Sequence, residues 1–155
     1  MPFNEREKRW HDTRNEETIH LATRTYEGTT KVDLELEGKS VIVTGGSRGI
    51  GQAIAQRMVA EGARVLIAAR RPDPLDEALG ALGEGAHGIA ADVTRVDDLD
   101  RIAAKANALF GGCDVLVKNA GTGTYKPFLE VTEDELQGGM AINFFAHFRL
   151  TQRVV

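Results

Sequence analysis

Short apolar runs alternate with stretches of helix-spaced apolar residues four times along this sequence. The runs at Ser40 to Thr44 and Arg64 to Ala69 are rich in branched apolar residues, and weaker runs lie at residues 87–93 and 114–121. After each run, apolar residues recur at the spacing of one face of a helix. Such alternation favours an α/β fold whose parallel strands are joined by right-handed crossovers.

The first part of the chain has a different pattern. Residues 1–35 are polar, mix acidic and basic side chains and have few regularly spaced apolar residues, which predicts a mobile arm. Residues 36–155 carry the strand and helix pattern and are interpreted as one domain. A net charge of −4, no apolar run of membrane-spanning length and a single cysteine, Cys113, favour a cytoplasmic protein. They do not favour nucleic acid or membrane as a partner.

A helix is expected to begin near Thr132, because Thr132 and Glu135 have the spacing of a capping box. The pair Gly138-Gly139 is expected to break or kink that helix. A longer helical stretch follows from Met140, and its apolar residues are Ile142, Phe145, Phe148, Leu150 and Val154. The sequence stops within this stretch, so we expect a domain that is truncated here.

Four glycines lie within seven residues at the junction between the first expected strand and its helix. Thr44-Gly45-Gly46-Ser47-Arg48-Gly49-Ile50-Gly51 fits a T-G-x-x-x-G-x-G arrangement. A nucleoside-triphosphate loop is disfavoured because Gln52 and Ala53 follow, where lysine and a hydroxyl residue are needed. Glycines here let the backbone approach a phosphate, whose charge the helix N-terminus stabilises. The loop therefore predicts a site for a dinucleotide pyrophosphate. The alternative, glycines that serve only a tight turn, is disfavoured by the strand before them and the helix after them.

These features together resemble the short-chain dehydrogenase/reductase family. The resemblance covers residues 36–155 and rests on the glycine loop, on Ala91-Asp92-Val93, on Asn119-Ala120-Gly121 and on Asn143. It implies a Rossmann-type, doubly wound parallel sheet of strand order 3-2-1-4, truncated before strands 5 to 7, in which Asp92 and Val93 flank the adenine. The cofactor-binding residues that it implies are Gly45, Ser47, Arg48, Gly49, Ile50, Gly51, Asp92, Val93, Asn119, Ala120 and Gly121.

The end of the second strand bears on which cofactor is bound. An acid about 20 residues after the glycines would bind the ribose 2′-hydroxyl of NAD, but the chain reads Ala68-Ala69-Arg70-Arg71. Guanidinium groups suit a 2′-phosphate because they donate paired hydrogen bonds, and Arg48, which lies in the glycine loop, is expected to be able to approach the same group. The sequence therefore predicts NADP(H) in preference to NAD(H). In the alternative reading, Arg70 and Arg71 only begin a solvated loop.

The resemblance implies hydride transfer between nicotinamide and a small carbonyl or alcohol substrate. In the family a tyrosine donates the proton and a lysine four residues later lowers the pKa of that tyrosine. Neither Tyr26 nor Tyr125 has a lysine at this spacing, and the family's serine would lie beyond residue 155. Only Asn143, matching the asparagine that organises the lysine and a water relay, remains as a catalytic residue. The chain alone is therefore expected to be inactive.

Three further expectations follow. The four histidines and the single cysteine form no metal-ligand pattern, so no metal is expected. The resemblance implies a homo-oligomer, dimer or tetramer, for the complete enzyme, with the last helix packed on its counterpart. Lys118 stands where the family usually has asparagine. We interpret it as a neutral change at a strand end, the alternative being a cation beside the cleft.

Two alternatives to a reductase without its catalytic half stay open. The chain could be a module that binds a nucleotide without catalysis. It could also be a degenerate fragment that folds poorly, because the edge of the fourth strand and the apolar face of the last helix would lack partners.

Overall fold

The computed structural model describes residues 33–155, so nearly all of the expected arm at residues 1–35 lies outside the described residues. Leu34–Val155 form one compact unit. Its parallel sheet contains β1 (Ser40–Thr44), β2 (Arg64–Ala69), β3 (Ala86–Ala90) and β4 (Val115–Val117). The strands lie in the order β3-β2-β1-β4, which confirms the predicted order and the Rossmann-type fold.

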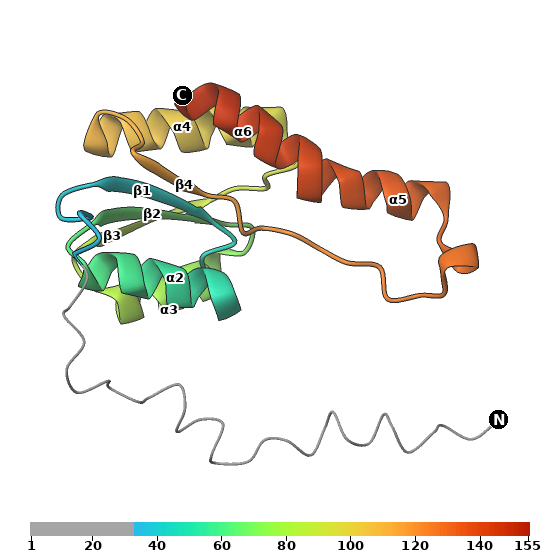
Figure 1. Ribbon diagram of the computed structural model, residues 1–155, viewed down its shortest axis with the longest axis horizontal. Coiled ribbons are helices and arrows are strands. Elements are labelled where there is room, and N and C mark those ends of the chain that lie inside the picture. Colours follow the sequence, from blue (N-terminus) through green and yellow to red (C-terminus); the bar gives the residue numbers. More distant parts are fainter. Residues whose placement is uncertain (1–32) are drawn as a thin grey trace, which may run out of the picture. The chain divides into compact units, whose positions relative to one another are not determined.

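Helices cover both faces of the sheet (Figure 1). On one face lie α2 (Gly49–Ala60) and α3 (Pro72–Leu82), and on the other lie α4 (Val96–Phe110) and α6 (Ala146–Val154). The strands supply two cores because successive side chains point to opposite faces. Val41 and Val43 pack with α2 and α3, whereas Ile42 packs with α4 and α6.

Two strands are shorter than their sequence patterns. Residues 87–93 were expected to be extended, but β3 ends at Ala90 because the chain turns at Asp92, whose carbonyl accepts from Arg95 N at 2.9 Å. In the run 114–121, only Val115–Val117 pair with β1, through Val41, Ile42 and Val43. Both strands therefore stop where the chain must leave the sheet.

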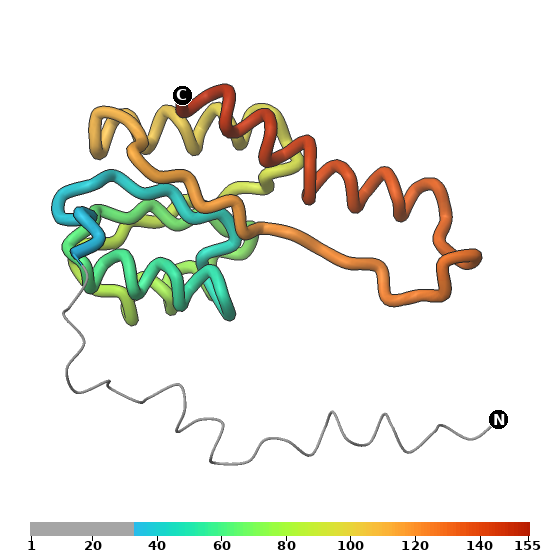
Figure 2. The backbone as a smooth tube through the Cα atoms, viewed as in Figure 1, coloured from blue at the N-terminus to red at the C-terminus, as the bar shows by residue number. Residues whose placement is uncertain are grey.

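After β4 the chain runs outward and returns as a nearly continuous helix (Figure 2). A short 3-10 turn (Phe128–Glu130) precedes α5 (Glu133–Met140), a π-turn (Ala141–Phe145) and α6. The capping box is confirmed: Thr132 Oγ1 accepts from Glu135 N at 3.3 Å, and Glu135 Oε2 accepts from Thr132 N at 2.9 Å.

Of the break or kink expected at Gly138-Gly139, the break is wrong. The α-helix continues through both glycines, and its geometry changes only afterwards, in the π-turn. Packing explains this outcome, since Ala146 and Leu150 are each 1% exposed and belong to the core under α4. That burial keeps the chain helical beyond the glycine pair.

None of the helices in residues 33–155 has the length and apolar character needed to cross a lipid bilayer.

Candidate functional site

A cleft of about 670 Å³ opens at the carboxyl ends of the strands. It lies over β1, where neighbouring connections leave the sheet in opposite directions toward β2 and β4, the position at which open parallel sheets bind ligands. Its lining residues are Gly45, Ser47, Arg48, Gly49, Ile50, Gly51, Ala68, Ala69, Arg70, Arg71, Ala91, Val93, Asn119, Ala120, Gly121 and Ile142.

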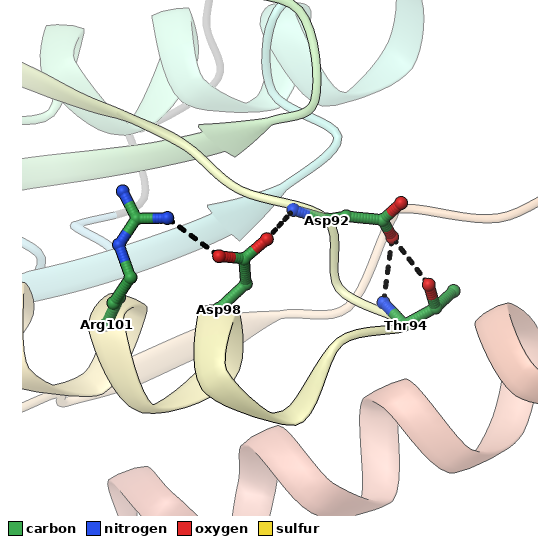
Figure 3. A network of polar contacts seen from close by, with 4 residues as sticks. All are labelled: Asp92, Thr94, Asp98 and Arg101. Atoms are coloured by element: carbon green, nitrogen blue, oxygen red, sulfur yellow. Dashed lines mark hydrogen bonds and ion pairs between the residues drawn. The ribbon is translucent and has the colours of Figure 1, made fainter.

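The structure brings all the sequence-predicted cofactor residues except Asp92 onto this lining. The carboxylate of Asp92 instead accepts hydrogen bonds from Thr94 N at 2.9 Å and Thr94 Oγ1 at 2.7 Å (Figure 3). Lys118 is exposed and does not line the cleft either. The predicted residues thus converge from four chain segments, while Asp92 contributes to the shape of a loop.

The glycine loop closes tightly on itself and on the end of β4. Gly45 has a φ of +67°, and a Cβ there would lie 3.0 Å from Ala120 Cα. A Cβ on Gly51 would collide with the carbonyl oxygen of Gly45 and the side-chain amide of Asn119. Glycine is needed at both positions, at the first also for its left-handed backbone conformation.

Helix α2 begins at the cleft lining, and no side chain caps its N-terminus. Arg48 is the N-cap residue, no side chain caps the helix, and no acidic residue lies in its first turn. The first intrahelical bond runs from Gln52 N to Arg48 O at 3.4 Å. The N–H groups of Gly49, Ile50 and Gly51 precede it, so they are available to an anionic ligand that the helix dipole would also attract.

A buried threonine joins the glycine loop to the turn after β4. Thr44 is 1% exposed, and its Oγ1 accepts from Asn119 N and Ala120 N, each at 3.1 Å, and donates to Val117 O at 3.3 Å. Asn119 Nδ2 returns hydrogen bonds to Thr44 O at 3.0 Å and Gly45 O at 3.2 Å. The sequence reading gave Thr44 no role, although a polar residue that ends an apolar strand needs a partner when buried.

The charged residues on the cleft lining are all positive. Arg48, Arg70 and Arg71 line it, all three are exposed, and no carboxylate is among the lining residues. Within residues 33–155, none of these guanidinium groups forms an ion pair or hydrogen bond. The cleft therefore favours an anionic ligand with more than one negative group.

Asn143 lies next to this cleft but is not among its lining residues. Its Nδ2 donates to Thr122 O at 2.7 Å and its Oδ1 accepts from Thr122 N at 2.9 Å. One turn later, His147 Nε2 lies 2.8 Å from Ala120 O. Two side chains of the returning helix thus hold the segment after β4, and the neighbouring Ile142 reaches the lining itself.

The β3–α4 connection contributes Ala91 and Val93 to the cleft lining. Asp98 Oδ2 accepts from Asp92 N at 2.8 Å, and Asp98 Oδ1 pairs with Arg101 Nη1 at 2.7 Å (Figure 3). The hydrogen bond from Asp92 N, followed by the one from Arg101, holds the pKa of the Asp98 carboxyl below its usual range. Asp98 is therefore a carboxylate at neutral pH and remains an acceptor.

Comparison with known proteins gives a consistent result. The family described as short chain dehydrogenase matches residues 39–155. Glucose 1-dehydrogenase of Gluconobacter oxydans is 41% identical over 110 residues, 68% of this chain and 41% of that protein. L-rhamnose 1-dehydrogenase (NADP(+)) of Thermoplasma acidophilum is 35% identical over 127 residues, 78% of this chain and 49% of that protein.

A solved structure agrees with these sequence matches. The 3-ketoacyl-(acyl-carrier-protein) reductase from Brucella melitensis, complexed with NADH, superimposes with a TM-score of 0.75 at 30% identity. The match covers 77% of this chain and 50% of that one. The chain thus spans about half the length of the proteins that it matches.

Proposed function

Because the chain belongs to the short-chain dehydrogenase family, we propose that residues 36–155 are the NADP(H)-binding part of an oxidoreductase. The reaction is hydride transfer between nicotinamide and a small carbonyl or alcohol substrate. The observation that carries this proposal is the cleft lined by three exposed arginines and no carboxylate.

The chemistry of the lining fits such a cofactor at three places. The free N–H groups at the start of α2 suit the pyrophosphate. Arg70 and Arg71 follow β2 and suit a ribose 2′-phosphate, with Arg48 on the loop beside them. Ala91 and Val93 are apolar and suit a purine face. When bound, NADP(H) supplies or accepts the hydride, and these residues bind and orient it.

The preference for NADP(H) rests on this chain's own arginines. The proteins it resembles include one named for NADP(+) and one complexed with NADH, so the family alone does not decide the matter. An acid at the end of β2 would accept hydrogen bonds from a ribose 2′-hydroxyl, and Arg70 stands there instead. A guanidinium group favours the phosphate over the hydroxyl because it adds charge attraction to its paired hydrogen bonds.

We propose that these 155 residues do not supply the group that transfers the proton. Thr30 and Leu129 follow Tyr26 and Tyr125 at the fourth position, where the family has lysine. We propose that Asn143 belongs to the catalytic group and that the chain by itself binds cofactor without turnover. The same observation favours a second candidate, a module that binds a nucleotide and has no catalytic role.

The complete enzyme is proposed to be a cytoplasmic homo-oligomer. Phe144, Phe145 and Phe148 on the returning helix are 54%, 38% and 54% exposed. Exposed aromatic side chains on one helix are typical of a subunit contact.

The test compares NADPH and NADH binding to the wild-type chain and to an Arg70→Ala/Arg71→Ala double variant. Charge-assisted hydrogen bonds contribute about 1.5–3 kcal/mol each, so we expect the loss of two to lower NADPH affinity about 100-fold or more, with little change for NADH. Calorimetric or fluorescence titration measures both affinities.

A control variant, Arg57→Ala/Arg149→Ala, removes the same charge from residues that do not line the cleft. It should bind both cofactors nearly as the wild type does. An equal loss of affinity for NADPH and for NADH in the Arg70→Ala/Arg71→Ala variant would contradict the 2′-phosphate assignment. No binding of either cofactor by the wild type would contradict the proposed function itself.

A further inference from the structure

Side-chain hydrogen bonds fix the conformation of the connection between β3 and α4 (Figure 3). Asp92 lies at its centre and is fixed at three atoms: its N–H donates to Asp98, its carbonyl accepts from Arg95 N, and its Oδ1 accepts from Thr94. Such a turn has little freedom to shift while these bonds persist.

This turn carries one wall of the cleft. Ala91 and Val93 flank Asp92, are 4% and 5% exposed, and both line the cleft. Ala91 is tied to the neighbouring strand through its N–H, which donates to Ala69 O at 2.9 Å. Within residues 33–155, no backbone hydrogen bond joins Val93 to the sheet. Its side chain belongs to the core that contains Ile42 and Leu66, and its backbone is positioned by the turn that precedes α4.

Asp98 supports this turn from the helix. It lies in the first turn of α4 with its side chain 15% exposed, and it reaches back past its own N-cap residue, Arg95, to Asp92 N. Arg101, one turn later, holds the other carboxylate oxygen at 2.7 Å. The carboxylate thus bridges the helix and the end of the strand.

Stabilisation of the helix dipole does not account for this arrangement. Asp97 lies in the same first turn, is exposed, and forms no hydrogen bond or ion pair within residues 33–155. It gives the dipole the same negative charge without reaching the turn. Asp98 differs from Asp97 in its hydrogen bond to Asp92 N, its ion pair with Arg101 and its lower exposure, so Asp97 is a control matched in charge and in helix position.

We propose that Asp98 is a positioning residue of the nucleotide site, which fixes Val93 on the cleft wall through its hydrogen bond to Asp92 N. It acts on the purine and 2′-phosphate end of the ligand, where Val93 lies on the same lining as Arg70 and Arg71. This inference rests on the proposed function, since it concerns the affinity of the same site.

A purely electrostatic role predicts the opposite sign. Removing a negative charge beside a cleft lined by arginines would tighten the binding of an anionic ligand. Loss of the positioning bond would weaken it. The direction of the change in affinity therefore separates the two roles.

The experiment measures binding of NADPH and of adenosine 2′,5′-bisphosphate to the wild-type full chain and to three variants. Asp98→Ala should weaken both ligands about fivefold to thirtyfold, the range that corresponds to one lost ordering interaction. Asp98→Asn keeps an acceptor oxygen and should restore most of the affinity. Asp97→Ala should bind both ligands as tightly as the wild type or slightly more tightly.

Amide hydrogen exchange gives a second readout that needs no ligand. The Asp92 N–H should be protected in the wild type and in Asp98→Asn, and should exchange faster in Asp98→Ala. If Asp98→Ala does not fold, Asp98→Ser replaces it, because its hydroxyl ends one bond short of the Asp92 N–H.

Each outcome is decisive. Wild-type affinity in Asp98→Ala, tighter binding in that variant, or failure of Asp98→Asn to restore binding would overturn the positioning role and leave the proposed function standing. If the wild-type chain binds neither ligand, the proposed function and this inference fall together.

Discussion

The sheet centre and the segment that follows β4 are built in different ways. Val41, Ile42 and Val43 of β1 are completely buried, as are Val65, Leu66 and Ile67 of β2. In residues 121–145 no residue is buried, and Tyr125, Phe128 and Leu129 are 98%, 88% and 94% exposed. The first region is held by packing on both faces and the second by a few polar contacts.

Two sets of polar contacts lie within this outer segment, residues 121–145. Asn143 binds the backbone of Thr122, and Lys126 Nζ pairs with Glu135 Oε1 at 2.6 Å beside the capping box. The cleft takes most of its lining from outside residues 121–145, which contribute only Gly121 and Ile142, so the proposed nucleotide site depends little on how the outer segment is covered. Substitutions in the two regions should therefore differ in kind as well as in size.

The largest contrast is expected from truncating one apolar side chain in each region. Ile42→Ala leaves a cavity between two packed faces and should lower the free energy of unfolding by about 2–5 kcal/mol. Leu129→Ala, on a side chain that is 94% exposed, should change it by less than about 0.5 kcal/mol. Urea denaturation measures both, and a cost of similar size at the two positions would contradict the comparison.

Alanine in place of glycine should act with opposite signs in the two regions. At Gly51 the added methyl group collides with Gly45 O and Asn119, so we expect a loss of about 1–3 kcal/mol and weaker NADPH binding. At Gly138, inside α5, a Cβ meets nothing within 4 Å, so alanine should stabilise the helix by about 0.5–1 kcal/mol.

Thermal unfolding with and without NADPH measures both glycine effects. Gly138→Ala serves as the control for the chemical change itself. A gain in stability for Gly51→Ala would mean that the loop is less tightly closed than the structure has it.

The smallest effect concerns the ionisation of Glu135 in the outer segment. The Lys126 ammonium group, followed by the Thr132 N–H, lowers the pKa of the Glu135 carboxyl from 4.5 to about 2. Because the folded-state pKa is depressed, the carboxylate's contribution to stability is present above pH 4.5 and is lost as the pH falls toward 2. Lys126→Met should raise the pKa of Glu135 toward its usual value.

Titration of the carboxyl carbon of Glu135 by NMR follows this change directly. Lys118→Met is the matched control, since it removes an exposed lysine that forms no ion pair within residues 33–155. It should leave the Glu135 titration where it is. An unchanged titration in Lys126→Met would show that the ion pair does not form in solution.

Local sequence patterns predicted the fold well because the residues whose apolar spacing indicates a strand or a helix are also those that are buried in the core. Branched apolar runs became β1 and β2 with the predicted bounds, and the order of all four strands is as predicted. The capping box at Thr132 was readable because both of its bonds are made by residues three positions apart. The prediction of a break at the glycine pair failed because burial of Ala146 and Leu150, seven or more residues further along, outweighs the low helix propensity of the two glycines.

The site was less predictable where one residue had two possible partners. The Asp92 carboxylate could bind a ligand or groups of its own turn, and in the structure it accepts hydrogen bonds from Thr94. Its spacing from Thr94 is that of an Asx turn, a signal that the sequence does carry. Asp98 could not be told from Asp97 in the sequence, because which of two adjacent acids reaches Asp92 N depends on where α4 begins.

The π-turn at Ala141–Phe145 limits how the length of this helix can change. A π-turn holds an additional residue relative to an α-turn. Here one anchored residue, Asn143, which is bound to Thr122, lies within the turn, and a second, Leu150, which is buried under α4, lies beyond it. Deleting one residue between them would restore α-helical geometry but rotate one anchor by about 100° relative to the other. Substitutions in this turn, such as at Phe144, should therefore be tolerated far better than insertions or deletions.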